Sequence, residues 1–475
     1  MRSLQISDND LAGRRFNGHD LHLNLLQRGF EADQLVWKKR SNDSHTFEIG
    51  RHYADRERIN SLVSGWENDL LTHGTLYPFS HSLLFDSKFL EADIVHYHLI
   101  HNFFFNINHL PILTAIKPSV WTLHDPWAIT GHCVHFFSCQ RWKSGCGDCP
   151  NLETEFALRK DSTALSWEIK RLAYQASKID LIVSSKWMYE IVRESPLTKH
   201  FEVHLIPFGI DREVFRPQTK PEAKQLLKIP RENKVIAFRA SSWKLKGLRF
   251  LIEALERLDQ SDKVTLLTSN EIGLINGLKK KFHTVELGWI DDVETLTSFY
   301  SAADIFVMPS EAESFGMSAI ESMACGTPVI AFDDTVLVDT IGIPRGGIAV
   351  PKGSSEALCM AIQSVLFDHD MRNRLANGAL EIVQEKYDLK RYFNNIVDLY
   401  QYVVDKRGQD DRSIYLLQQL KQISNKELEI GSEQIVYKAD LARLSIKEKI
   451  SNKLRRYPIL HQLIRTVYRR IRGKK

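Results

Sequence analysis

The sequence predicts an α/β protein with two doubly wound domains, each built on a parallel sheet. Short apolar runs rich in β-branched residues alternate with helical stretches along most of the chain, a pattern typical of βα units. One set of such runs precedes residue 208, and a second begins near residue 235. Because each set supplies its own strands and helices, we expect two sheets. The 475 residues are 43% hydrophobic and 26% charged, which excludes a disordered or fibrous chain.

The first set of elements predicts an N-terminal domain over residues 1–207. Its first helix is stopped by Gly29, and the helix that begins at residue 186 is ended by Pro196. The predicted strands cover residues 4–7, 94–99, 120–124, 181–185 and 204–209, with helices over residues 20–28 and 186–194.

The second set predicts a C-terminal domain over residues 208–385. Leu251, Leu255 and Leu258 repeat with helical spacing and indicate one buried helix face. Three prolines between residues 216 and 230 indicate the region that links the two domains. The predicted strands cover residues 235–240, 264–269, 284–289, 305–310 and 328–332, with helices over residues 248–258 and 293–303.

Charge is distributed unevenly, and residues 407–475 are predicted to form a linker and a basic amphipathic tail. Residues 443–475 contain twelve Lys and Arg against one acid, Glu448, so they carry +11 while the rest of the chain carries −7. Such a helix suits an anionic membrane surface, at ~1 kcal/mol per basic residue. The alternatives are a solvated helix packed on the body and a nucleic-acid contact. We expect no nucleic-acid partner, because the tail has few aromatic residues and no recognition module.

Targeting signals are not evident in the sequence. The first thirty residues hold no apolar segment, and no run of 18 apolar residues occurs, so we expect neither a secretory signal nor a membrane span. Six cysteines in such a chain do not indicate a disulfide framework. We therefore expect a cytoplasmic protein, with the tail at the cytoplasmic face of the inner membrane.

The most informative segment is residues 309–332, PSEAESFGMSAIESMACGTPVIAF. Two glutamates eight positions apart, Glu313 and Glu321, are expected in a loop and in the helix that follows. A turn before this helix leaves backbone N–H groups free, and these favour an anion or sugar hydroxyls. A carboxylate on the same side can accept hydrogen bonds from two vicinal hydroxyls. The alternative is two surface glutamates beside a core helix.

A basic turn, FRASSWKLKGLRFLIEAL, occupies residues 238–255 between a strand and a helix. Arg239, Lys244 and Lys246 are candidates to clamp a diphosphate, because charge-assisted hydrogen bonds contribute ~1.5–3 kcal/mol each. Gly247 would allow a close approach. The alternative is an ordinary solvated turn.

With the ACGTPV segment, the pattern of two glutamates resembles the signature of retaining glycosyltransferases of the GT-B fold, family GT4. The resemblance implies two Rossmann-like domains that face each other across a cleft, a nucleotide-sugar donor, and no cofactor for catalysis. It implies that Glu313 binds the donor sugar and Glu321 the ribose. The backbone amides of Phe315, Gly316 and Met317 would then face the sugar and the phosphates.

Other segments fit the same family in part. Its members carry an Arg and a Lys-Gly pair in the basic turn, which assigns the diphosphate to Lys246 with Arg239 or Lys244. A glycine turn near the donor phosphate corresponds to AGRRFNG around Gly13, which departs from the Gly-Gly pattern; a plain surface turn is the alternative. IPFGIDREVFRP resembles the interdomain crossover, and residues 386–406 resemble the helix that crosses back to the first domain.

Residues 122–152 begin with TLHDPWAITGHC, which resembles the HD-x-W-x-x-T-G-x-C pattern of colanic-acid and other exopolysaccharide glycosyltransferases. The resemblance implies a bacterial surface-polysaccharide pathway and a lipid-linked or oligosaccharide acceptor. It places His124 against the donor sugar, although a purely structural histidine is the alternative. His124, Glu313 and Lys246 form the predicted catalytic set.

A cysteine-rich loop over residues 133–149 contains Cys133, Cys139, Cys146 and Cys149. The C-x2-C half has the usual spacing of a tetrahedral zinc site, whereas the C-x5-C half is unusual. A structural zinc, buried free thiols and disulfides are the three interpretations. His132 and His135 are spare ligands nearby.

The sequence therefore predicts a retaining hexosyltransferase that uses a nucleotide sugar. Two alternatives stay open. One is another enzyme on the same fold, such as a nucleotide-sugar epimerase or a phosphorylase. The other is a non-catalytic scaffold that binds a partner through its tail.

Overall fold

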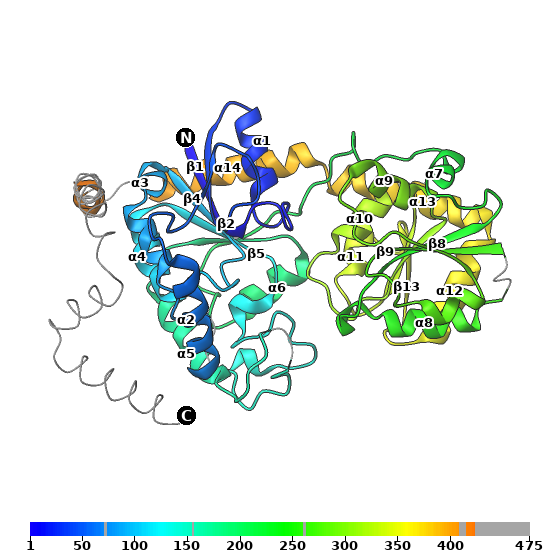
Figure 1. The fold of residues 1–475 in the computed structure, drawn as a ribbon, viewed down its shortest axis with the longest axis horizontal. Helices are drawn as coiled ribbons and strands as arrows, with labels where there is room; N and C mark the ends of the chain where they lie inside the picture. The colour runs from blue at the N-terminus through cyan, green and yellow to red at the C-terminus, as the bar shows by residue number, and fades with distance from the viewer. Residues whose placement is uncertain (71–73, 154–155, 260–262, 408–414, 423–475) are drawn as a thin grey trace, which may run out of the picture.

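The computed structural model describes residues 1–70, 74–153, 156–259, 263–407 and 415–422. Two parallel sheets lie at the centres of two adjacent domains (Figure 1). The strand order is β3-β2-β1-β4-β5-β6-β7 in the first sheet and β10-β9-β8-β11-β12-β13 in the second. The predicted pair of doubly wound α/β domains is thus confirmed.

Strands such as β4 and β5 are buried along their whole length, because helices cover both faces of a parallel sheet. The first sheet contains β1 (Arg2–Asn9), β2 (Glu31–Lys38), β3 (Thr46–Glu48), β4 (Ile94–His98), β5 (Ser119–Leu123), β6 (Asp180–Val183) and β7 (Val203–Leu205). Its helices are α1 (His19–Gln27), α2 (Arg56–Leu70), α3 (Ser87–Glu91), α4 (Leu110–Ile116), α5 (Thr163–Gln175) and α6 (Lys186–Glu194).

The second sheet follows the same plan. Its strands are β8 (Lys234–Ala240), β9 (Val264–Asn270), β10 (His283–Glu286), β11 (Ile305–Met308), β12 (Val329–Phe332) and β13 (Gly347–Val350). Its helices are α7 (Lys220–Leu226), α8 (Leu248–Arg257), α9 (Val293–Ala302), α10 (Met317–Ala324), α11 (Leu337–Ile341), α12 (Ser355–Phe367) and α13 (His369–Lys386). Helix α14 (Leu389–Arg407) then returns to the first domain (Figure 1).

Each sheet has one switch point, where the strand order reverses. It lies between β1 and β4 in the first sheet and between β8 and β11 in the second. Loops that leave two such strands diverge and leave a crevice at the carboxyl edge of the sheet, where ligands bind in open α/β folds. The topology therefore indicates that the ligand-binding loops are residues 10–18, 241–247 and 309–316.

The chain crosses between the domains twice, and the two crossings touch. The Ile210 amide donates to the Tyr387 carbonyl at 2.8 Å. A Cβ on Gly209 would lie 2.5 Å from the Leu389 Cα, so this glycine is needed where the crossings pack. Helix α14 then lies along the first domain (Figure 1), where the Tyr400 hydroxyl is 2.6 Å from the His96 Nδ1.

Several elements differ from the predictions. Strands β2, β3 and β13 were not foreseen, and helix α7 lies inside the predicted linker region over residues 216–230. Residues 415–422, predicted as linker, are helical, and Leu417 and Leu420 contact the core of the first domain. The basic tail over residues 443–475 lies outside the described residues. No helix among the described residues is long and apolar enough to cross a membrane.

Candidate active site

The loops after β8 and β11 meet at the switch point of the second sheet. Gly247 has a left-handed backbone, with φ +65°, and a Cβ there would lie 1.9 Å from the Pro309 carbonyl oxygen. Only glycine allows this contact between the two loops. This contact places Lys246, one residue before Gly247, and Glu313, four residues after Pro309, in the same crevice.

These loops enclose a cavity of about 280 Å³ on the second domain. Arg239, Lys246, Glu313 and Ser318 contribute its charged and polar wall. The Lys246 Nζ lies 2.6 Å from the Glu313 Oε1, and the Ser310 hydroxyl donates to the same oxygen at 2.9 Å. The cavity thus offers two cations and one fixed carboxylate, a suitable set for a phosphorylated sugar.

Helix α10 begins at the edge of this cavity. Gly316, its N-cap, is left-handed with φ +96° and makes no side-chain cap, and a Cβ there would lie 2.4 Å from the Leu337 Cδ2. Phe315 and Met317 beside it are buried, and of residues 315–318 only Ser318 lines the cavity. Arg239 donates to the Ser318 hydroxyl at 3.2 Å. Free N–H groups at a helix start of this kind favour an anion.

Glu321 lies one turn further along α10 and is held from two sides. The buried Tyr300 hydroxyl donates to its Oε2 at 2.7 Å. Arg15, from the first domain, forms an ion pair with its Oε1 and lies over the Phe215 ring at 4.9 Å. A carboxylate with two donors holds one orientation, and this ion pair joins the two domains across the cleft.

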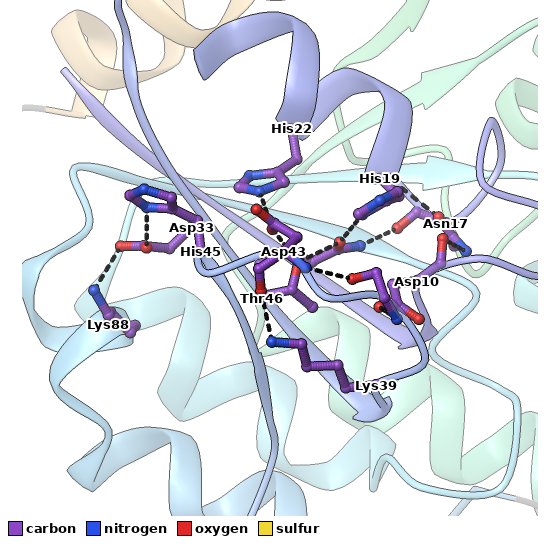
Figure 2. Close-up of polar contacts among 12 residues, drawn as sticks. Asp10, Asn17, His19, His22, Asp33, Lys39, Asp43, His45, Thr46 and Lys88 are labelled. Carbon is purple, nitrogen blue, oxygen red and sulfur yellow. Dashed lines mark hydrogen bonds and ion pairs between the residues drawn. The ribbon is translucent and has the colours of Figure 1, made fainter. Parts of the chain in front are cut away.

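A buried polar network fixes the loop that carries Arg15 (Figure 2). The Asn17 amide nitrogen donates to the Asp10 and Ala12 carbonyls at 2.9 and 3.0 Å. The Asp10 carboxylate in turn accepts from the Arg40 and Ser41 amides, both at 2.8 Å. Because Asn17 and Asp10 are each held by several hydrogen bonds, the loop is fixed, and Arg15 is presented to the second domain.

His124 follows β5 and packs among aromatic rings at the domain interface. Its ring stacks on Phe208 at 5.7 Å and 5°, with Phe16 edge-on at 5.7 Å. Phe208 in turn contacts Phe315, in the turn before α10. Neither ring nitrogen of His124 has a hydrogen-bond partner among the described residues. Burial lowers the pKa of His124 to about 3, so the imidazole is neutral. Its ring nitrogens are buried, and His124 lines neither the cavity of the second domain nor the one between the domains.

A second cavity, of about 370 Å³, lies between the domains and shares Glu313 with the first. The first domain contributes His135, Phe136 and Phe137 to its wall, and the second contributes Asp339. Burial lowers the pKa of His135, and the nearby Glu313 opposes this effect. Glu313 therefore stands where two binding spaces meet, one within the second domain and one between the domains.

Not every predicted residue reaches the site. Lys244 is exposed and does not line the cavity, whereas Lys246, two positions on, does. Gly13 is exposed and left-handed, with φ +67°, and lines neither cavity. Arg239, whose spacing seemed too far upstream, lines the cavity directly.

Sequence reasoning missed Tyr300 and the pairing of Arg15 with Glu321. Tyr300 sits in α9 within an apolar helix pattern, which reads as ordinary core. Arg15 and Glu321 are 306 positions apart, and their contact depends on how the domains face each other. The tandem arginines in AGRRFNG, at a sheet's carboxyl edge, were the one available signal.

The four loop cysteines gather on one side of the first domain. All are free, and the side-chain donor atoms of His132, Cys133 and Cys149 lie within 4.8 Å of one another. Cys139 and Cys146 are near enough to interact electrostatically with them. His135, a predicted spare ligand, faces the interdomain cavity instead.

Comparison with known proteins matches residues 219–381 to the family described as glycosyl transferases group 1. The D-inositol 3-phosphate glycosyltransferase of Mycobacteroides abscessus is 33% identical over 359 residues, which cover 72% of this chain and 74% of that protein. The protein of the same name from Saccharomonospora viridis is 31% identical over 217 residues, 42% of this chain. In that case the chain spans only about half of the relative's length, 49%.

Among solved structures, the chain resembles Anabaena HepE in complex with UDP, with a TM-score of 0.58 and 15% identity. The likeness covers 85% of this chain and all of that one. At this identity it concerns the fold alone, and it confirms the predicted two-domain GT-B fold.

Proposed function

This chain belongs to the group 1 glycosyltransferases, and on that premise we propose that it transfers a sugar from a nucleotide-sugar donor to a glycan acceptor, with retention of configuration. The observation that carries the proposal is the shared position of Glu313. It belongs both to the cationic cavity of the second domain and to the cavity between the domains. A residue at such a junction can contact the donor sugar where an acceptor arrives.

The donor is assigned to the cavity of the second domain. Lys246 and Arg239 would bind the diphosphate together with the N–H groups of α10. Glu321 would accept hydrogen bonds from the ribose hydroxyls, oriented by Tyr300. The bound UDP in the structure of HepE supports a uridine nucleotide as the first donor to test.

Catalysis is then a matter of position and charge. Lys246, Arg239 and the helix end would stabilise the diphosphate as it leaves, and Glu313 would fix the sugar. The neutral His124 would support the turn before α10 through Phe208. The proposal needs no covalent nucleophile, and no metal takes part in it. The bond between the anomeric carbon and the diphosphate oxygen would break, and the acceptor hydroxyl would bond to that carbon on the same face while its proton passes to the departing diphosphate. Attack on this face gives retention.

The acceptor is assigned to the interdomain cavity, and we propose a lipid-linked glycan of a bacterial surface-polysaccharide pathway. The aromatic side chains of Phe136 and Phe137 suit the apolar face of a sugar ring. The +11 charge of residues 443–475 would hold the enzyme at an anionic membrane where such lipids lie. Removal of residues 443–475 should abolish co-sedimentation with vesicles containing anionic lipid; unchanged co-sedimentation would disprove the membrane contact.

A second acceptor class is favoured by the relatives. The proteins of Mycobacteroides abscessus and Saccharomonospora viridis are named for D-inositol 3-phosphate. Lys186 and Lys352 line the interdomain cavity and would suit a phosphorylated polyol.

One experiment separates these acceptors from the alternatives on the same fold. Labelled UDP-sugars are incubated with the full chain alone, with inositol 3-phosphate, and with a bacterial lipid extract. Proton NMR then identifies the products and the anomeric configuration. We expect transfer to one acceptor with retention. A change in the donor sugar without acceptor would indicate an epimerase, and an inverted product would disprove retention.

A further inference from the structure

The cysteine-rich loop has features that the transfer reaction does not use. It extends from Gly131 to Cys149 beside the start of α5, and the reactive residues lie outside it. Cys133 is buried, and its Sγ lies within 4.8 Å of the Cys149 Sγ. Sulfur atoms gathered in this way are typical ligands of a metal ion.

The sulfur atoms also receive backbone hydrogen bonds. The Gly131 amide donates to the Cys146 Sγ at 3.2 Å, and the Asn151 amide donates to the Cys149 Sγ at 3.4 Å. The second bond joins a cysteine to the amide two positions on, immediately after the C-x2-C turn. Amide donors stabilise a thiolate more than a thiol, because the sulfur then carries a full negative charge.

A buried cation lies beside the same cluster. Lys170 in α5 is 1% exposed, and its ammonium donates to the Trp127 and Thr130 carbonyls at 2.6 and 2.9 Å. No carboxylate within the described residues lies at ion-pair distance from it. Cys146 and Cys133 are among the groups whose negative charge would stabilise it. An ammonium buried among carbonyls, 3.4 Å from the centre of the Trp127 ring, is costly unless it is neutral or paired. A zinc ion held by four thiolates has a net charge of −2 and would favour the charged form of Lys170.

We propose that Cys133, Cys139, Cys146 and Cys149 bind one structural Zn²⁺ ion. Four sulfur ligands at about 2.3 Å from the ion leave it tetrahedral, with no open position for substrate. Lys170 compensates the negative charge of the centre. His132 lies close enough to be a ligand, since its Nδ1 is 3.3 Å from the Cys133 Sγ and its donor atom is within 4.8 Å of the Cys149 Sγ. We leave it out of the ligand set because four thiolates complete a tetrahedral site.

The zinc would act on the site through the loop. His135, Phe136 and Phe137 lie between the first two cysteines and form a wall of the interdomain cavity. The C-terminal end of the loop is fixed to the body independently, since the Cys149 amide donates to the Asp161 carboxylate at 2.6 Å. The metal would hold the central part of the loop and with it this wall of the cavity. The effect of zinc on acceptor binding rests on the proposed function, whereas zinc binding itself does not.

The first test is the metal content of the full chain without an affinity tag, purified under reducing conditions. Inductively coupled plasma mass spectrometry should find about one zinc per chain after dialysis against a weak chelator. Cys133→Ser and Cys149→Ser should lose it, whereas Cys359→Ser, a buried cysteine of α12, should keep it. A zinc-free wild-type chain that takes up neither Zn²⁺ nor Co²⁺ would overturn the proposal, as would an intact mass that shows disulfides.

Two further measurements do not depend on variants that might fail to fold. Displacement of zinc from the wild-type chain by a mercurial should release about one ion, and Co²⁺-substituted protein should show thiolate-to-cobalt charge transfer. His132→Asn should retain zinc; loss would overturn the ligand set.

Lys170 provides a matched comparison for the charge argument. Lys170→Met should lower zinc affinity by about 10- to 100-fold, as outer-shell changes do. Lys117→Met should leave zinc affinity unchanged, because Lys117 is also buried and also donates to two carbonyls, at 2.7 and 2.6 Å, but these belong to Leu90 and Ala92. Equal effects of the two substitutions would contradict a thiolate centre beside Lys170. Nucleotide binding on the second domain should survive zinc removal, which separates this proposal from the proposed function.

Discussion

Replacement of Lys246 by alanine should weaken nucleotide binding, whereas replacement of Lys244 should not. The two lysines lie two positions apart in the same turn, yet only Lys246 lines the cavity. One charge-assisted hydrogen bond contributes ~1.5–3 kcal/mol. Since the Lys246 side chain is 31% exposed, solvent screening favours the lower end, ~1.5–2 kcal/mol. At 1.4 kcal/mol per tenfold change, the dissociation constant should rise about 10- to 30-fold.

Isothermal titration calorimetry with UDP measures this change directly. Lys244→Ala is the control, because it removes the same charge from the same turn and leaves the cavity wall intact. We expect its dissociation constant to stay within about twofold of wild type. Equal weakening by both substitutions would show that the turn acts only through its net charge, and the assignment of the diphosphate to Lys246 would then be wrong.

Three further changes test other parts of the site. Tyr300→Phe removes the 2.7 Å hydrogen bond to Glu321. It should lower the free energy of unfolding in urea by about 1.5–3 kcal/mol, the range for a hydrogen bond to a charged group, and should weaken UDP binding; an unaltered affinity would contradict the orienting role of Tyr300. Gly316→Ala places a Cβ on a left-handed residue, 2.4 Å from the Leu337 side chain, and should destabilise the protein by about 1–2 kcal/mol. Gly277→Ala is its control, because a Cβ there would meet nothing within 4 Å. Similar losses of stability in the two variants would refute the strain argument. Burial lowers the pKa of His124 to about 3, so between pH 6.5 and 3 this histidine binds a proton in the unfolded chain but not in the folded one, and the free energy of unfolding falls as the pH falls. Chemical denaturation of His124→Asn should show a shallower loss of unfolding free energy than wild type over this range. Parallel curves would contradict the buried neutral imidazole.

The elements that the sequence reveals are those in which burial follows an apolar pattern. Strand β4 and helix α6 were predicted closely, since apolar and β-branched residues define them. Strand β2 was missed, because Asp33 and Gln34 interrupt its apolar run. Both are buried: Asp33 lies 3.2 Å from the Lys88 Nζ, and the Gln34 Oε1 lies 2.8 Å from the His19 Nδ1. Tertiary pairing offsets the cost of burying them, and no local pattern reports it.

The site likewise contains residues that a local sequence pattern reveals and residues that it does not. Glu313, Glu321 and Lys246 could be found because they stand in short segments of distinctive order. The separation of Lys246 from Lys244 depends on the direction of each side chain in one turn. The contact of Arg15 with Glu321 depends on the mutual placement of two domains. Long-range geometry of this kind is absent from local sequence.

The central claim is that Glu321 and its neighbours bind a nucleotide sugar. The most direct measurement is thermal unfolding with a panel of nucleotide sugars, for wild type and Glu321→Ala. A ligand at a hundredfold excess over its dissociation constant stabilises the folded state by ~2.7 kcal/mol. We expect one nucleotide series to raise the melting temperature of wild type and to lose this effect in the variant. Equal stabilisation of both proteins, or of neither by any nucleotide sugar, would contradict the account.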